Sequence, residues 1–110
     1  MDTGAMKRDR QRALIELVQL SRDMLVAGEA DDWHRVERLE ARRRQGVERW
    51  FAQPVELVER DLAEAAIQEI LSLNQQLEGL AHKRRAALGG KIRQSRQGRV
   101  ATRAYRRCAP

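Results

Sequence analysis

The side chains best suited to chemistry are few and lie far apart in the sequence. His34 and His82 are the two histidines, and neither has a Cys or a second His at the spacing of metal ligands. The acid pair Asp31-Asp32 is better explained as a helix cap than as a general acid and base, since a carboxylate there accepts from free backbone N–H groups. No glycine-rich phosphate loop and no motif of a serine hydrolase or zinc protease is present. We therefore predict a binding protein that is not an enzyme and that uses no metal or cofactor.

Compartment is indicated by the cysteine content and by the hydropathy pattern. Cys108 is the single cysteine, so no disulfide forms within the chain, which fits a reducing cytosol. The N-terminus has no apolar signal-peptide core. Apolar runs are a few residues long, far below the ~18 that span a bilayer. We predict a cytoplasmic protein without membrane insertion.

The net charge of +6 is distributed unevenly. Residues 1–78 hold 12 Lys/Arg and 16 Asp/Glu, a net of −4, whereas residues 79–110 hold ten Lys/Arg and no acid, a net of +10. The chain is thus a slightly acidic body with a strongly basic end. The run Arg42-Arg43-Arg44 is interpreted as a solvated helix face, with arginine stems along the surface and balancing charge from Glu37, Glu40 and Glu48.

Composition and periodicity indicate an all-α protein. Ala, Leu, Glu, Gln and Arg dominate, and the chain has two prolines and seven glycines in 110 residues. We predict one domain, residues 1–110, that forms an antiparallel bundle of three helices with a short, mobile fourth helix at the C-terminus. The expected helices cover residues 7–27, 32–52, 54–88 and 91–106. Gly28 ends the first helix, Pro54 begins the third, and Gly89-Gly90 ends it.

The third helix is expected to be the longest and to organise the others. Its apolar stripe comprises Val58, Leu62, Ala66, Ile70, Leu73, Leu77, Leu80 and Leu88. A second helix of about 20 residues covers this stripe only to about Asn74, so Leu77, Leu80, Ala81 and Leu88 overhang. Each exposed Leu forgoes on the order of 1.5–3 kcal/mol of burial, so another segment, a second copy or a partner helix should cover them.

The sequence also resembles flagellar export chaperones of the FliT type over residues 12–107. The C-terminal half carries the stronger likeness, in the motifs Ile67-x-x-Ile70-Leu71, Leu77-x-Gly79-Leu80 with Arg84, Gln94-Ser95 and Ala104-Tyr105. A weaker match follows Met24-Leu25, Gly28 before Trp33, and Leu39-Glu40. The pieces have the order and spacing of that family.

The resemblance implies a cytoplasmic bacterial protein of three antiparallel helices plus a mobile fourth. Such proteins bind the C-terminal segment of the filament-cap protein and deliver it to the export gate. They also contact the export ATPase complex and, in some bacteria, restrain the master flagellar transcription activator. The family's binding face maps onto Ile67, Leu71, Asn74 and Glu78. To these we add Leu77 and Leu80 from the overhang.

The fourth helix of such proteins folds over the third and limits access to it. In this chain the apolar residues of that autoinhibitory lid are Ile92, Val100, Ala104 and Tyr105. We expect residues 91–110 to be held weakly, because ordering about 15 residues costs much of what their burial contributes.

Two other interpretations stay open. The ten basic residues of the C-terminal end suit a nucleic-acid-binding module, against which stand the acidic body and the scattered arginines. A generic helical adaptor or coiled-coil homodimer is the second, because Ile70, Leu73, Leu77, Leu80 and Arg84 follow a heptad seam for about two heptads.

Overall fold

The computed structural model describes residues 3–94, and the side chains of residues 8–90. Within that range every regular element is helical: α1 (Thr3–Glu29), α2 (Trp33–Phe51), the 3-10 helix η1 (Leu57–Glu59) and α3 (Arg60–Gln94). With 35 residues against 27 and 19, α3 is the longest, as the periodicity predicts. None of these helices has the length and apolarity needed to cross a bilayer.

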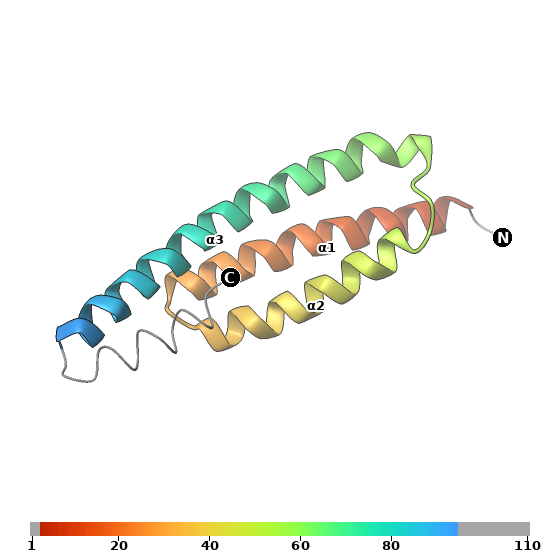
Figure 1. Ribbon diagram of the computed structural model, residues 1–110. Helices are drawn as coiled ribbons and strands as arrows, with labels where there is room; N and C mark the ends of the chain where they lie inside the picture. The colour runs from red at the N-terminus through yellow and green to blue at the C-terminus, as the bar shows by residue number, and fades with distance from the viewer. Residues whose placement is uncertain (1–2, 95–110) are drawn as a thin grey trace. The chain divides into compact units, whose positions relative to one another are not determined.

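The chain divides into two compact units, residues 1–77 and 78–110, and α3 runs from the first into the second. In the first unit α1, α2 and the beginning of α3 pack together, with α2 antiparallel to both neighbours (Figure 1). This confirms the predicted three-helix bundle.

Two apolar clusters form the core of the first unit. One contains Leu14, Leu17, Trp50, Ala63 and Ala66, and therefore joins all three helices. The other contains Met24, Ala27, Val36 and Leu39, with Trp33 and Leu77 packed against it. Burial of these side chains is the main stabilising term, because each large one contributes about 1.5–3 kcal/mol.

The α1–α2 pair is held by an unusually close approach at Gly46. A Cβ at this position would lie 2.7 Å from Leu17 Cδ2, closer than real Cβ atoms come to a neighbour. Gly46 therefore lets α2 settle onto α1 at the level of the first cluster, and a larger residue would force the helices or Leu17 to move.

The turn between α1 and α2 differs from the prediction at one residue. Asp32 N–H donates to Ala27 O at 2.8 Å and Asp31 N–H to Gly28 O at 3.0 Å, the hydrogen-bond pair of a Schellman C-cap. The left-handed residue is Asp31, with φ of 58°, so the prediction that Gly28 ends the helix is wrong. Asp residues tolerate this conformation better than most, and Gly28 instead lies buried inside α1.

The predicted cap of α2 is confirmed. Asp32 is the N-cap, and its Oδ1 accepts from Arg35 N–H at 3.2 Å. The Trp33 indole N–H donates to Asp31 Oδ1 at 2.6 Å, so both carboxylates of the pair have structural partners. The pair therefore serves the caps of α1 and α2, as the sequence predicts.

The structure begins α3 later than the sequence suggests. Pro54 lies in the connection, η1 starts at Leu57, and the α-helix starts at Arg60. Glu59 Oε1 accepts from Glu56 N–H at 3.0 Å, so the start is fixed by a glutamate side chain and not by the proline. As a consequence Val58, placed by the sequence on the buried stripe, is exposed at 69%.

The other end of α3 also lies further along the chain. Gly89 and Gly90 remain helical, neither has a positive φ, and the helix continues to Gln94. A glycine pair lowers helix stability by about 1 kcal/mol per residue, which is not enough to end a helix whose neighbours are good helix formers. The prediction of a stop at Gly89-Gly90, with a new helix from residue 91, is therefore wrong.

The expected overhang of Leu77 is wrong as well. Leu77 is half-buried and packs against the second cluster. Because α1 extends to Glu29 and α2 begins at Trp33, the closed end of the hairpin reaches one turn further along α3 than Asn74.

Candidate functional site

The histidines and acids form no reactive cluster in the described part of the chain. His34 is highly exposed, and its Nδ1 lies 3.8 Å from Glu37 Oε2, one turn along α2. His82 is exposed on α3. Across the described residues, no three His, Cys, Asp or Glu side chains gather as metal ligands would.

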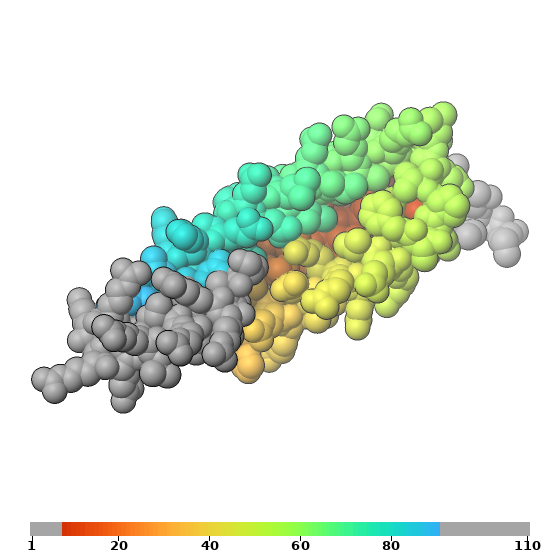
Figure 2. All heavy atoms as spheres, in the orientation of Figure 1, coloured from red at the N-terminus to blue at the C-terminus, as the bar shows by residue number. Residues whose placement is uncertain are grey.

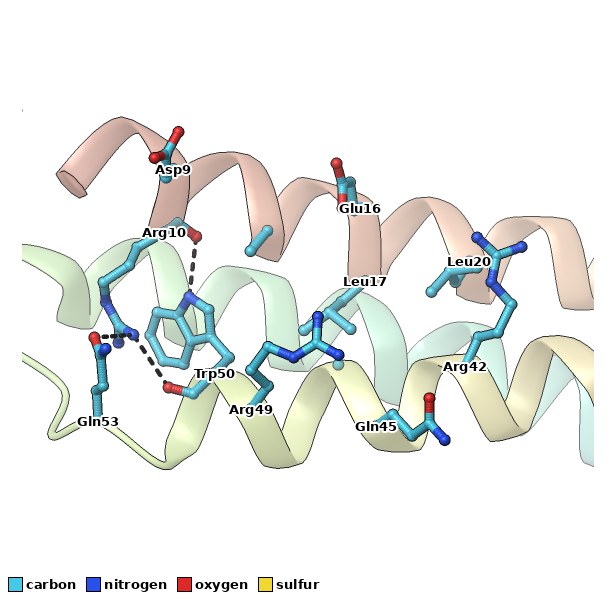
Figure 3. A pocket seen from close by; sticks show the side chains of 12 residues that line it. Asp9, Arg10, Glu16, Leu17, Leu20, Arg42, Gln45, Arg49, Trp50 and Gln53 are labelled. Carbon is cyan, nitrogen blue, oxygen red and sulfur yellow. Dashed lines mark hydrogen bonds between the residues drawn. The ribbon is translucent and has the colours of Figure 1, made fainter. Parts of the chain in front are cut away.

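One hollow lies between α1 and α2, and Figure 3 shows its lining. At one end the Arg10 guanidinium stacks 4.0 Å from the centroid of the Trp50 ring and donates to Trp50 O at 3.2 Å. In return Trp50 Nε1–H donates to Arg10 O at 2.9 Å, and Arg10 Nε is also paired with Glu59. These contacts close the open end of the bundle, so Arg10 and Trp50 have structural roles.

The rest of that hollow carries both signs of charge. Asp9 and Glu16 lie on the α1 side, with Arg42 and Arg49 on the α2 side (Figure 3). A lining of mixed charge has no net preference for an anion, so this hollow does not resemble a nucleotide or phosphate site.

The apolar surface of the first unit offers two candidate docking faces. The α1–α3 face has a hollow lined by Ile15, Val18, Leu62 and Ala65, together with Arg22 and Glu69 at its edge. We define the α2–α3 face by Asn74 of α3, whose Oδ1 accepts from Arg43 of α2 at 2.7 Å, and by the exposed residues that helical spacing places on the same sides, Ile67 and Leu71 on α3 and Phe51 on α2. Figure 2 views this second face, with atoms of α1 visible between α2 and α3.

The α2–α3 face exposes large apolar side chains at helical spacing. Ile67 and Leu71 are exposed at 40% and 55%, and they lie one turn apart on the same side of α3. Phe51 follows Arg43 by eight residues, and Ile67 precedes Asn74 by seven. Since Arg43 contacts Asn74 and the helices are antiparallel, Phe51 and Ile67 lie at about the same level.

The predicted partner-binding residues are therefore not equivalent in the structure. Ile67 and Leu71 are exposed, and Asn74 is half-buried against Arg43. Leu77 packs against the second cluster and is therefore not free to contact a partner. Glu78 is exposed and Leu80 half-buried in the second unit. Ile92 lies in the last turn of α3, with its side chain outside the described residues, and Val100, Ala104 and Tyr105 lie outside them altogether.

Sequence reasoning missed the role of Arg43. Arg42 and Arg44 are exposed as the solvated-face interpretation expects, whereas Arg43 turns inward between the helices. Its Nη1 donates to Ser21 Oγ on α1 at 2.9 Å and to Asn74 Oδ1 on α3 at 2.7 Å. The signal was available, because position 43 continues the apolar stripe of Val36, Leu39, Val47 and Trp50.

The fold and this surface define a class of protein: a small helical bundle that displays exposed apolar side chains on one helix and has no catalytic cluster in its described part. The chain matches the family model of the flagellar protein FliT over residues 11–107, and it belongs to that family. The protein is thus a non-enzymatic flagellar export chaperone of the cytoplasm that binds the filament-cap protein. No curated protein and no solved structure matches the chain.

Proposed function

We propose that the C-terminal segment of the filament-cap protein binds the α2–α3 face as an amphipathic helix. The observation that carries this proposal is the pair Ile67 and Leu71, two large apolar side chains left exposed one turn apart on the longest helix. A guest helix with apolar residues at i, i+3 and i+4 has matching spacing, which is the usual way a helix is recognised in a groove.

Binding of the guest on this face needs neither nucleotide hydrolysis nor a covalent step. The guest segment exchanges water for the side chains of Ile67, Leu71 and Phe51, and its own apolar face is covered at the same time. An aggregation-prone segment is thereby kept from self-association until the export apparatus receives it.

The test is calorimetric titration with a synthetic peptide of the filament-cap C-terminal segment from the same bacterium. Ile67→Asp and Leu71→Asp place a charge in the apolar contact, and each should weaken binding by at least ~2 kcal/mol, about thirtyfold. The matched control is Ile15→Asp, because Ile15 is comparably exposed at 58% but lines the α1–α3 hollow.

The outcomes separate the two faces. Loss of binding in the α3 variants with unchanged binding of Ile15→Asp supports the α2–α3 face. The reverse pattern would move the binding site to the α1–α3 face, and unchanged binding in all three variants would contradict both. Circular dichroism of each variant establishes that it remains folded.

We further propose that this chain contacts the export ATPase complex and the export gate at surfaces that the cap segment leaves open. We propose the same for the master flagellar transcription activator, which some members of the family restrain. The support is family membership. Residues after Gln94 are proposed to compete with the cap segment, in place of the predicted lid from residue 91, because the helix continues through that position. The alternative of a homodimer through α3 would appear as twice the mass of the chain in analytical ultracentrifugation without peptide.

A further inference from the structure

Arg43 joins three helices of the first unit through hydrogen bonds of a single atom. From α2, its Nη1 reaches Ser21 Oγ on α1 and Asn74 Oδ1 on α3. Ser21 is 2% exposed and its own hydroxyl donates to Leu17 O at 3.1 Å. The guanidinium is therefore held in place between the three helices at the level of Asn74, and Arg43 remains half-buried.

The positive charge of Arg43 is only partly compensated. Both described acceptors are neutral oxygens, one from a hydroxyl and one from an amide. The nearest acid on its own helix, Glu40, accepts from Arg44 at 3.4 Å on the exposed side. Burial lowers the pKa of the Arg43 guanidinium from its ordinary value, and the charge of Glu40 opposes that shift.

A guest on this face changes the surroundings of that charge. Asn74 follows Leu71 by three residues, so a helix that covers Ile67 and Leu71 and continues for one turn also covers Asn74 and the guanidinium beside it. Covering removes the water that solvates the remaining donors of Arg43. An apolar guest leaves a buried charge without a counterion, which is strongly unfavourable, whereas a guest carboxylate forms a charge-assisted pair with the guanidinium.

We propose that Arg43 is a specificity-determining residue that selects guest helices with an Asp or Glu within one turn of the apolar side chain that contacts Leu71. This rests on the proposed function, since it assumes that the guest lies on the α2–α3 face. Ser21 and Asn74 are positioning residues that fix the guanidinium between the helices, at the level that the guest covers. The residue then disfavours wrong guests as well as favouring right ones, because an apolar helix without the carboxylate would bury the Arg43 guanidinium without a counterion.

The experiment is a double-mutant cycle measured by calorimetric titration of the full chain. The probe is the synthetic C-terminal peptide of the filament-cap protein, made as the natural sequence and as a series in which each Asp or Glu is replaced singly by Asn or Gln. Each peptide is titrated into the natural chain, Arg43→Met and the control Arg44→Met. Arg44 is the neighbouring arginine on α2, exposed and paired with Glu40.

The expected result is one carboxylate whose replacement weakens binding to the natural chain about tenfold or more, as loss of one partner of a desolvated charge pair does. The same replacement should change binding to Arg43→Met by less than about twofold, whereas Arg44→Met should behave as the natural chain does. Additive effects for every peptide would overturn the proposal, as would a cap segment without any acidic residue.

Failure of this inference is distinguishable from failure of the proposed function. If Ile67→Asp and Leu71→Asp abolish binding but no carboxylate couples to Arg43, the face is correct and the role of Arg43 is wrong. If the α3 variants bind normally, the proposed function itself is wrong. Should Arg43→Met not fold, the peptide series on the natural chain still decides, because indifference to every carboxylate replacement would contradict the proposal.

Discussion

Gly46 and Gly79 are both helical glycines, but their surroundings are opposite. A Cβ at Gly46 would meet Leu17 Cδ2 at 2.7 Å, whereas a Cβ at Gly79 would meet nothing within 4 Å. The first glycine is required by a close approach of two helices. The second reduces helix stability without a described packing reason.

We predict that Gly46→Ala and Gly79→Ala change stability in opposite directions. Overpacking against the buried Leu17 costs about 1–3 kcal/mol, which over most of that range outweighs the ~1 kcal/mol that alanine contributes to helix propensity. Gly79→Ala keeps only the favourable part and should stabilise by about 0.5–1 kcal/mol. Urea unfolding followed by far-ultraviolet circular dichroism measures both. Stabilisation by both variants would show that the close approach at Gly46 is not tight.

At the residue scale, sequence reasoning placed some positions correctly and others not: Arg42 and Arg44 are exposed as expected, whereas Val58 is exposed although the pattern placed it on the buried stripe. Ile67 and Leu71 were selected from a family likeness, and both are exposed. Arg43 was assigned to a solvated face because its neighbours are arginines, although its spacing from Val36 and Leu39 is that of a core position. An arginine is expected at a core position only if hydrogen-bond acceptors lie beside it. The acceptors of Arg43 are on Ser21 and Asn74, which are 22 and 31 residues away in the sequence.

The start of α2 is capped by a single carboxylate, that of Asp32. Asp32 Oδ1 accepts from Arg35 N–H, while the backbone of the same residue completes the C-cap of α1. This residue therefore takes part both in the end of α1 and in the start of α2.

We predict that Asp32→Ala lowers the free energy of unfolding by about 1 kcal/mol, because the free N–H groups at the start of α2 lose their acceptor. Asp32→Asn is the matched control, since an amide oxygen retains the cap and should cost only a few tenths of a kcal/mol. Thermal and urea unfolding of the two variants check this. An equal loss in both would indicate that the negative charge, and not the hydrogen bond, stabilises the helix.

At the element scale, the number and order of helices followed from periodicity, but their ends did not. Pro54 is a plausible first residue of a helix by local preference, yet the connection continues to Glu56 because Glu59 supplies the cap. Gly89-Gly90 is a plausible stop, yet the helix runs through it. Local preferences of about 1 kcal/mol compete with one another at such positions, so the sequence alone does not fix the boundary.

At the scale of the whole molecule, the basic end of the chain can act in one of two ways: it competes with the cap segment, or its arginines bind the partner themselves. Residues 95–110 contain five arginines and no acid. We predict that a chain ending at Gln94 binds the cap peptide more tightly, on the order of tenfold, because removal of a competitor raises the fraction of chains ready to bind. Titration of the full and shortened chains at two salt concentrations measures the effect.

The affinities of the two chains, and their dependence on salt, show whether residues 95–110 compete, have no effect or bind the partner. Equal affinity of the two chains would show that residues 95–110 do not compete. Loss of binding in the shortened chain, together with a steep fall of affinity with salt for the full chain, would instead make the arginines the binding element.

The overall architecture was predictable because long amphipathic helices joined by short connections have few ways to bury their stripes. The choice of face was not, because both sides of α3 carry apolar residues: Leu62 shares a hollow with α1, whereas Ile67 and Leu71 lie on the side of α3 that carries Asn74. Periodicity shows that a helix has excess apolar surface, and only the placement of its neighbours shows which part is left over.

The close approach at Gly46 also has a consequence for the order of folding. α1 and α2 are joined by a short turn and approach each other closely at Gly46. α3 follows a longer connection and packs Ala63, Ala66 and Leu77 against them. Local pairs form before distant ones, since less loop entropy is lost, so the hairpin is the expected nucleus and α3 docks afterwards. During synthesis the hairpin sequence emerges from the ribosome first. The surface proposed to receive the guest is therefore completed only when α3 docks on the hairpin, and a hairpin without α3 cannot yet bind a guest there.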